Sequence, residues 1–182
     1  MMKTTKNEEK IRRTSKRLRR IFQIAAFALP FFPALFWLFY NDLPLVMQQH
    51  TFAGRTETWL PLNSRIIALA GNIPATILAV LALVGLKRLF ALYEQGCYFQ
   101  AENVRLFRAL GRLAVWSVLA DVVNNTVLEI ARTINNPPGE RLLSIGFSSD
   151  HAKLLLVAAI IMLIGMVIDE ARKIHEEHQL TV

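Results

Sequence analysis

The chain has 182 residues, of which 53% are hydrophobic and only 19% are charged, and its mean hydropathy is +0.34. This balance is more apolar than that of soluble domains and favours a membrane protein. The formal net charge of +7 would raise the question of nucleic-acid binding in a soluble protein. The single cysteine, Cys97, excludes an internal disulfide and a cysteine-based zinc site.

Four apolar stretches predict membrane spans, because a spanning helix needs about 20 mostly apolar residues. The predicted spans cover about 21–40, 66–86, 109–130 and 150–168. The first contains Pro30 and Pro33, which a span tolerates where neighbouring groups satisfy the freed carbonyls. A cleaved signal peptide is the alternative interpretation of the first stretch, but its apolar run is too long for a typical signal core.

The basic residues predict the orientation of these spans. Sixteen of the 21 Lys and Arg residues fall in residues 1–20, in the connection around 87–112 or after the fourth span. The positive-inside rule therefore predicts that both termini are cytoplasmic. The basic segment 1–20 is expected to contact anionic lipid headgroups. Nucleic-acid binding is disfavoured because no aromatic interleaving or recognition motif accompanies the run.

The connection between the second and third spans alternates apolar and charged residues from Lys87 to Arg108 and is interrupted by Gly96. This pattern predicts two short amphipathic helices against the membrane face, and a partner-binding surface would need the same pattern. The predicted fold is all-α: an integral four-transmembrane-helix bundle with short amphipathic cytoplasmic helices. It comprises a basic segment 1–20, a membrane domain 21–168 and a cytoplasmic tail 169–182.

Two blocks of sequence resemble a known family. The first block, 93–111, carries Tyr93, Gly96, Phe99, Glu102, Asn103 and Gly111. The second comprises 143–148, before the last span, and the closing segment 176–182. Both resemble the bacterial membrane proteins grouped as domain of unknown function 2975, the YoaS-like proteins. Gln100 and Gln179 depart from residues common in that family, a helix-capping Thr or Ser and a Glu.

The resemblance implies an integral protein of the bacterial cytoplasmic (inner) membrane without an established activity. Members of this family are often encoded beside a small helix-turn-helix regulator. The resemblance therefore implies a partnership with a cytosolic helix-turn-helix regulator of transcription, which is an argument by association.

The third span has an unusual polar face. A charged residue at the centre of a span is costly, so Asp121 is expected to point away from lipid. At 100° per residue, six polar residues fall within about 80° of the Asp121 direction, Asp121 itself included. They are Ser117, Asp121, Asn124, Asn125, Glu129 and Arg132. This face is expected to point into the bundle.

Asn72 in the second span lies as far from the outer end of its helix as Asn124 does in the third. The expected polar cluster therefore comprises Asn72, Asp121, Asn124 and Asn125, with Arg65, Glu129 and Arg132 around its mouth. Such a cluster suits a cation, a proton or a small external ligand. The alternative is structural: the amides form hydrogen bonds across the helices and satisfy the Asp121 carboxyl group.

Motifs of several enzyme classes are missing. Asp121 lacks the glycine context and the carboxylate partner of an intramembrane aspartyl protease, and no phosphate loop or dinucleotide fingerprint occurs. The histidines of His175-Glu176-Glu177-His178 lack metalloprotease spacing and are expected on a solvated helix. We therefore expect no catalytic, metal or cofactor site. The expected function is a non-enzymatic sensory or regulatory role, and the alternative is an oligomeric cation- or proton-coupled transporter that uses Asp121.

Overall fold

The computed structural model describes residues 6–44, 46–48, 59–141 and 143–180, with the side chains of 7–174 within these ranges. In this part of the chain the regular structure is helical and includes no strand. The elements are α1 (Lys6–Ala28), α2 (Phe31–Leu38), the short 3₁₀ helix η1 (Tyr40–Asp42), α4 (Leu62–Glu94), α5 (Ala101–Thr133) and α6 (Ser149–Leu180).

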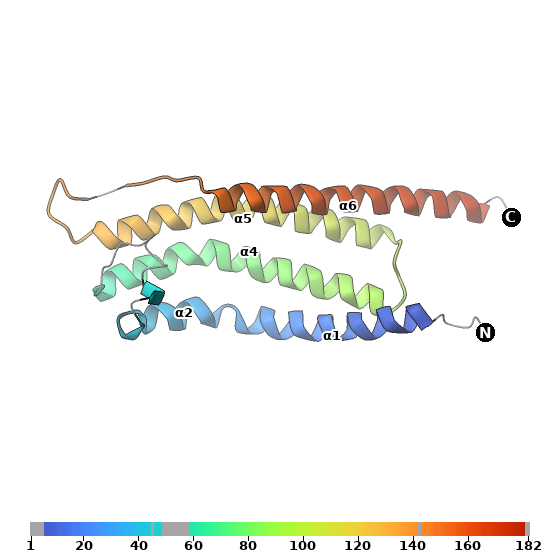
Figure 1. Cartoon of the computed structure of the whole chain (residues 1–182), viewed down its shortest axis with the longest axis horizontal. Coiled ribbons are helices and arrows are strands. Elements are labelled where there is room, and N and C mark those ends of the chain that lie inside the picture. Colours follow the sequence, from blue (N-terminus) through green and yellow to red (C-terminus); the bar gives the residue numbers. More distant parts are fainter. Residues whose placement is uncertain (1–5, 45, 49–58, 142, 181–182) are drawn as a thin grey trace.

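The long helices lie side by side in chain order (Figure 1). α1 packs along α4, α4 along α5, and α5 along α6. No extensive packing joins α1 to α6 among the described residues. The helices therefore form an open row, whereas the sequence led us to expect a bundle around an interior. An open row leaves apolar helix faces uncovered: only 11% of the most apolar window of α4 is buried, and the same share of that of α6.

Two single helices, α4 and α6, are long and apolar enough to cross a membrane. α1 and α2 meet at a bend of 41° and pass the same test together, as one broken span. α5 has the length of α4, but it is not among the helices that qualify, in keeping with its charged Arg112, Asp121 and Glu129. The described residues thus contain two or three membrane-length apolar helices, and four spans remain a prediction.

Proline chemistry accounts for the break between α1 and α2. Pro30 and Pro33 have no backbone N–H group, so neither can donate the helical bond that would continue α1. The last regular bond before the break joins Leu29 N–H to Ala25 O at 2.8 Å, and Phe32 N–H then reaches Leu29 O at 3.2 Å. The first predicted span therefore consists of two helical pieces.

Most of the basic N-terminal segment is helical, and it packs beside the C-terminal end of α4. The rings of Phe22 and Phe90 stack with centroids 5.5 Å apart. Arg19 Nε lies 2.8 Å from Glu94 Oε2, and Arg12 Nε donates to the backbone oxygen of Glu94 at 2.9 Å. Cations at this position interact favourably with the free carbonyls that end a helix.

The connection between α4 and α5 differs from the two short helices expected from the sequence. Residues 87–94 are the last turns of α4, and residues 101–108 are the first turns of α5. A Schellman turn ends α4: Cys97 N–H donates to Leu92 O at 2.9 Å, and Gly96 N–H donates to Tyr93 O at 3.2 Å. Gly96 adopts φ +82°, which favours glycine. The chain is therefore helical on both sides of a single tight turn, and the ends of the long helices α4 and α5 take the place of the two short helices expected.

At the opposite end of the row, aromatic and polar contacts join the helices. Trp37 and Tyr40 are buried against Leu60, Ala68 and Leu128. The side chain of Asn41 is fixed in place because its Nδ2 donates to Leu60 O at 3.0 Å while its Oδ1 accepts from Leu60 N–H at 2.9 Å. This end is therefore held together by side chains from α2, η1, α4 and α5.

Candidate functional site

The candidate site joins the middle of α5 to the first turn of α6 through Asp121 and His151. His151 Nε2 lies 2.7 Å from Asp121 Oδ2. The histidine side chain is only 3% exposed, whereas 48% of the aspartate side chain is exposed. The pair therefore combines a buried imidazole with a carboxylate that remains accessible on one side.

The backbone of the α6 N-terminus determines which nitrogen of His151 carries the proton. Ser148 N–H donates to His151 Nδ1 at 2.9 Å, so Nδ1 must present its lone pair. A neutral imidazole then carries its proton on Nε2 and donates it to Asp121. His151 thereby makes the contact that Glu or Gln makes in a capping box, three residues after the N-cap. The same side chain starts α6 and attaches it to α5.

Two neighbours complete this site. Asn125, one turn further along α5, donates from Nδ2 to Asp121 Oδ2 at 3.3 Å. The Phe147 ring lies 5.0 Å from the His151 ring, centroid to centroid. Because the aromatic ring and the helix start enclose the imidazole, the carboxylate is the part of the site that an external ion or ligand reaches first.

The other predicted cluster residues lie elsewhere. Asn124 is 9% exposed, and its Oδ1 lies 3.3 Å from where a Cβ on Gly71 would be; within the described residues this oxygen has no hydrogen-bond partner. Asn72 Nδ2 donates to Ala68 O in its own helix at 2.9 Å. Asn72 also lines a cavity of about 230 Å³ beside Pro30. The structure therefore brings Asp121 and Asn125 together, turns Asn124 toward α4 and turns Asn72 toward the α1–α2 break.

Glu129 and Arg132, predicted at the mouth of the cluster, form their own pair with Oε2 and Nη2 2.7 Å apart. Arg65, the other predicted mouth residue, donates from Nη1 to Leu38 O at 2.8 Å. Glu129 lies eight residues after Asp121, or about 12 Å along the helix. This pair therefore lies near the end of the row where Trp37 and Tyr40 are buried.

A second set of contacts joins α5 to α6 nearer the other end of the row. Arg108 Nη2 lies 2.9 Å from Asp169 Oδ2. Between the two polar links the helices approach closely: a Cβ on Gly111 would lie 2.6 Å from Met162 Cγ, and one on Gly165 would lie 3.1 Å from Phe107 Cβ. α5 and α6 are therefore in contact from the Asp121–His151 pair to the Arg108–Asp169 pair.

The residues of the predicted cytoplasmic motif have mostly local structural contacts. Asn103 is fully buried, and its Nδ2 donates to Cys97 O at 2.8 Å and to Tyr98 O at 2.6 Å. These bonds fix the turn at the start of α5, where Gln100 makes no side-chain cap. The Tyr93 and Tyr98 rings lie 5.8 Å apart. The other motif residues divide as follows: Phe99 and Glu102 are exposed, and Gly111 is buried.

His151, whose Nε2 lies 2.7 Å from Asp121 Oδ2, was not predicted as a site residue from the sequence. A histidine in the first turn of the last apolar helix was the available signal. In the described part of the chain no group of three or more His, Cys, Asp or Glu side chains is arranged to hold a metal ion. The side chains of the predicted tail motif, His175 to His178, lie outside the described residues.

The fold and the site define an all-helical protein with membrane-length apolar helices and a polar contact between two of them. Comparison with protein families matches residues 20–182 to the family "Protein of unknown function (DUF2975)". The chain therefore belongs to this family, in agreement with the resemblance noted from its motifs. Comparisons with curated proteins and with solved structures found no match.

Proposed function

We propose that this protein is a four-span sensory or regulatory protein of the bacterial cytoplasmic membrane, with the Asp121–His151 contact as its input. In this topology α1 and α2 form the first span, and α4, α5 and α6 form the others. The distribution of basic residues supports cytoplasmic termini. The hydropathy of α4 and α6 supports insertion into a bilayer.

The observation that carries this proposal is the 2.7 Å contact between Asp121 Oδ2 and His151 Nε2. Polar side chains in membrane spans commonly mark ion, proton or ligand sites. The two helices that meet there continue to the Arg108–Asp169 pair, about 20 Å away along α5. A change at the outer contact therefore has a physical route to the cytoplasmic ends of α5 and α6.

The tautomer gives this input a chemical mechanism. A second proton on His151 would occupy Nδ1 and remove the acceptor that now receives Ser148 N–H. A cation bound at Asp121 would compete with His151 for the carboxylate. The other charged groups near the histidine, Asp150 and Lys153 on α6, pair with each other at 2.7 Å. Either event would alter how α6 begins and how it is attached to α5.

The output would be a change in the cytoplasmic surfaces formed by 87–108 and 169–182. The partner we propose is a cytosolic helix-turn-helix regulator, in keeping with the family resemblance. No direct contact between this chain and nucleic acid is part of the proposal.

The second candidate is an oligomeric cation- or proton-coupled transporter. It rests on the 48% exposure of the Asp121 side chain, which leaves the carboxylate open on one face of the row. A homo-oligomer would be required, because the described helices form an open row without an enclosed path of their own.

Spin labels test the sensory proposal. In a Cys97→Ser background, labels at Arg105→Cys on α5 and Lys173→Cys on α6 report the separation of the cytoplasmic ends in reconstituted protein. We expect the distance distribution to shift when the pH is lowered, because a second proton on His151 would remove the acceptor of Ser148 N–H. Asp121→Asn and His151→Gln should remove this response.

Asp150→Asn is the matched control, since it removes a neighbouring carboxylate that forms its ion pair with Lys153 at 2.7 Å. It should leave the response intact. An unchanged distance distribution in the unsubstituted protein, together with Asp121-dependent ion flux into liposomes, would replace the sensory proposal with the transporter.

A further inference from the structure

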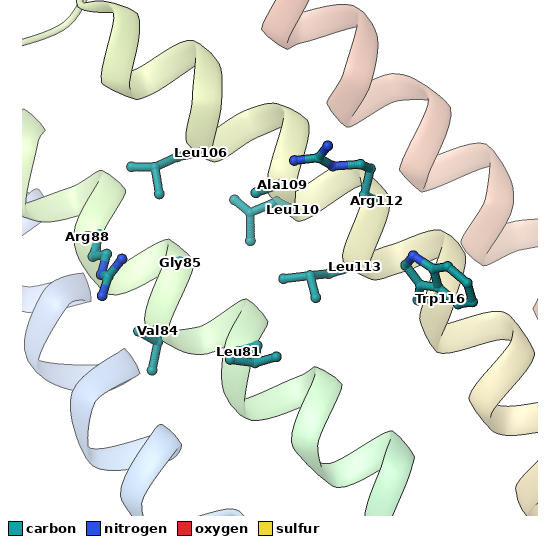
Figure 2. A pocket seen from close by; sticks show the side chains of 10 residues that line it. All are labelled: Leu81, Val84, Gly85, Arg88, Leu106, Ala109, Leu110, Arg112, Leu113 and Trp116. Carbon is teal, nitrogen blue, oxygen red and sulfur yellow. The ribbon is translucent and has the colours of Figure 1, made fainter.

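A groove of about 510 Å³ lies between α4 and α5, away from the Asp121–His151 contact. Its volume is within the range of small-molecule and cofactor sites. Two arginines, Arg88 on α4 and Arg112 on α5, lie on its rim, and apolar side chains separate them (Figure 2). The groove therefore combines a cationic rim with an apolar surface.

Helix geometry directs the two arginines toward a common level. Gly85 faces Leu110, since a Cβ on Gly85 would lie 3.1 Å from Leu110 Cδ2. Arg88 follows Gly85 by three residues and Arg112 follows Leu110 by two, so their Cα atoms are about 7.5 Å apart along the antiparallel axes. Side chains lean toward the N-terminus of their own helix, which shortens this separation along the axes.

Neither arginine has an ion-pair partner among the described residues. The acidic side chains nearby are engaged by other cations: Glu94 by Arg19, Asp169 by Arg108 and Glu102 by Arg105. Arg88 and Arg112 are both exposed. Arg112 also lies inside the predicted third span, where an unpaired charge is costly. Among the described residues no carboxylate is therefore available to pair with these two arginines.

The apolar part of the groove suits a hydrocarbon chain. It is lined by Leu81, Val84, Leu113 and Trp116, which continue from the arginines toward the middle of the row. Leu81 is 49% exposed and Trp116 is 59% exposed. A soluble anion would leave this surface uncovered, whereas a lipid supplies a phosphate and an acyl chain together.

We propose that the groove binds one anionic phospholipid, with its phosphate between Arg88 and Arg112 and an acyl chain along Leu81, Val84 and Trp116. Arginine pairs well with phosphate because its planar donors can bind two oxygens at once. The inference rests on the proposed membrane location, since the lipid comes from the surrounding bilayer. It is independent of any sensory role of Asp121.

Native mass spectrometry of the purified full chain tests this inference. Protein is extracted in detergent and mixed with phosphatidylglycerol or phosphatidylcholine of matched acyl chains. We expect one phosphatidylglycerol to remain bound preferentially. The double variant Arg88→Gln/Arg112→Gln should lower that preference roughly thirtyfold, since two basic groups that each contribute about 1 kcal/mol to attraction of anionic lipid are removed together.

Arg105→Gln/Lys173→Gln is the matched control, since it removes the same charge from exposed residues outside the groove and outside segment 1–20, whose carboxylate partners are 3.9 Å and 3.2 Å away. It should retain the preference. Equal loss in both double variants, or no preference in the unsubstituted protein, would overturn the site. Displacement of the lipid by millimolar inorganic phosphate would also overturn it, because a small-anion site would then suffice.

Membrane fractionation of the same preparations separates this inference from the proposed function. Unsubstituted protein that is not found in the membrane fraction contradicts the proposed location and the lipid site together. Protein that is membrane-bound but retains no phosphatidylglycerol contradicts the lipid site alone.

Discussion

His151 Nε2 lies 2.7 Å from Asp121 Oδ2, although 30 residues separate the two along the chain. The contact joins α6 to α5 at the point where α6 begins. Since the helices form an open row, α6 packs extensively on α5 alone among the described helices. The attachment of α6 therefore depends on the Asp121–His151 contact, the close contact at Gly111 and the Arg108–Asp169 pair.

A double-mutant cycle measures the Asp121–His151 contact. Asp121→Ala would remove the acceptor of the buried His151 Nε2–H group. His151→Ala would remove the acceptor of the Ser148 N–H group. We expect each single variant to lower stability and the two to be coupled by about 1 kcal/mol, since residues in contact couple by this order. Thermal unfolding in detergent measures the effect. Asp150→Ala/Lys153→Ala, an exposed pair on the same helix turn, should show no measurable coupling. Additive effects at Asp121 and His151 would contradict the contact.

Gly111 is the position where α5 and α6 are closest. Gly111→Leu would place a side chain where Met162 Cγ already lies, because even a Cβ would be 2.6 Å from it. We expect a loss of about 1–3 kcal/mol of stability, as for other overpacked contacts. Met162→Ala should restore part of this loss. Gly146→Ala serves as the control, since a Cβ there meets no atom within 4 Å. Equal tolerance at the two glycines would argue against close packing of α5 on α6.

Asn103 is expected to stabilise the α4–α5 turn. Asn103→Asp keeps the size of the side chain but replaces its amide donor with a carboxylate, which faces Cys97 O and Tyr98 O. We expect a loss of about 1–3 kcal/mol, the cost of buried groups left without partners. Limited proteolysis should then cut at this turn. Glu102→Gln, at the exposed neighbouring position, should behave like the unsubstituted chain. Resistance to cleavage in Asn103→Asp would show that the two bonds are dispensable.

The topology is testable by thiol labelling in intact cells. In a Cys97→Ser background, a cysteine at the exposed Glu140 should react with a membrane-impermeant maleimide. A cysteine at the exposed Gln95 should react only after the cells are permeabilised. The expectation follows from the excess of Lys and Arg on the side of the α4–α5 turn. The opposite pattern would invert the orientation and place Asp121 nearer the cytoplasmic end of the lipid-facing region.

Several features could be predicted from the sequence because they depend on local residue patterns. The helical fold follows from the long apolar stretches, the turn at Gly96 from its glycine, and the family from the motif around Asn103. The bend after Ala28 was not predicted, although Pro30 and Pro33 were recognised. Those prolines remove two backbone donors so close together that one helix ends and another begins.

The candidate site was predicted only in part, because Asn72 was matched to Asn124 by its depth along the helix, without its rotation about the helix axis. Asn72 follows Gly71, the residue that faces α5, by one position, and is therefore turned by about 100°. The partner of Asp121 came instead from the start of α6. No periodic pattern within α5 could identify His151, because the contact depends on where α6 begins relative to α5. That position is set by the path of the connecting chain before Ser149. The open row was also not predicted, since hydropathy does not distinguish a face covered by protein from one covered by lipid.

The most direct test of the Asp121–His151 contact is nitrogen-15 NMR of histidine-labelled protein in lipid near neutral pH, with His151→Gln identifying the signal of His151. The structure predicts a neutral imidazole that is protonated at Nε2 and bare at Nδ1. It also predicts that Asp121→Asn changes the Nε2 chemical shift while Asp150→Asn does not. A proton on Nδ1, or an Nε2 chemical shift that does not change in Asp121→Asn, would contradict the proposed link between α5 and α6.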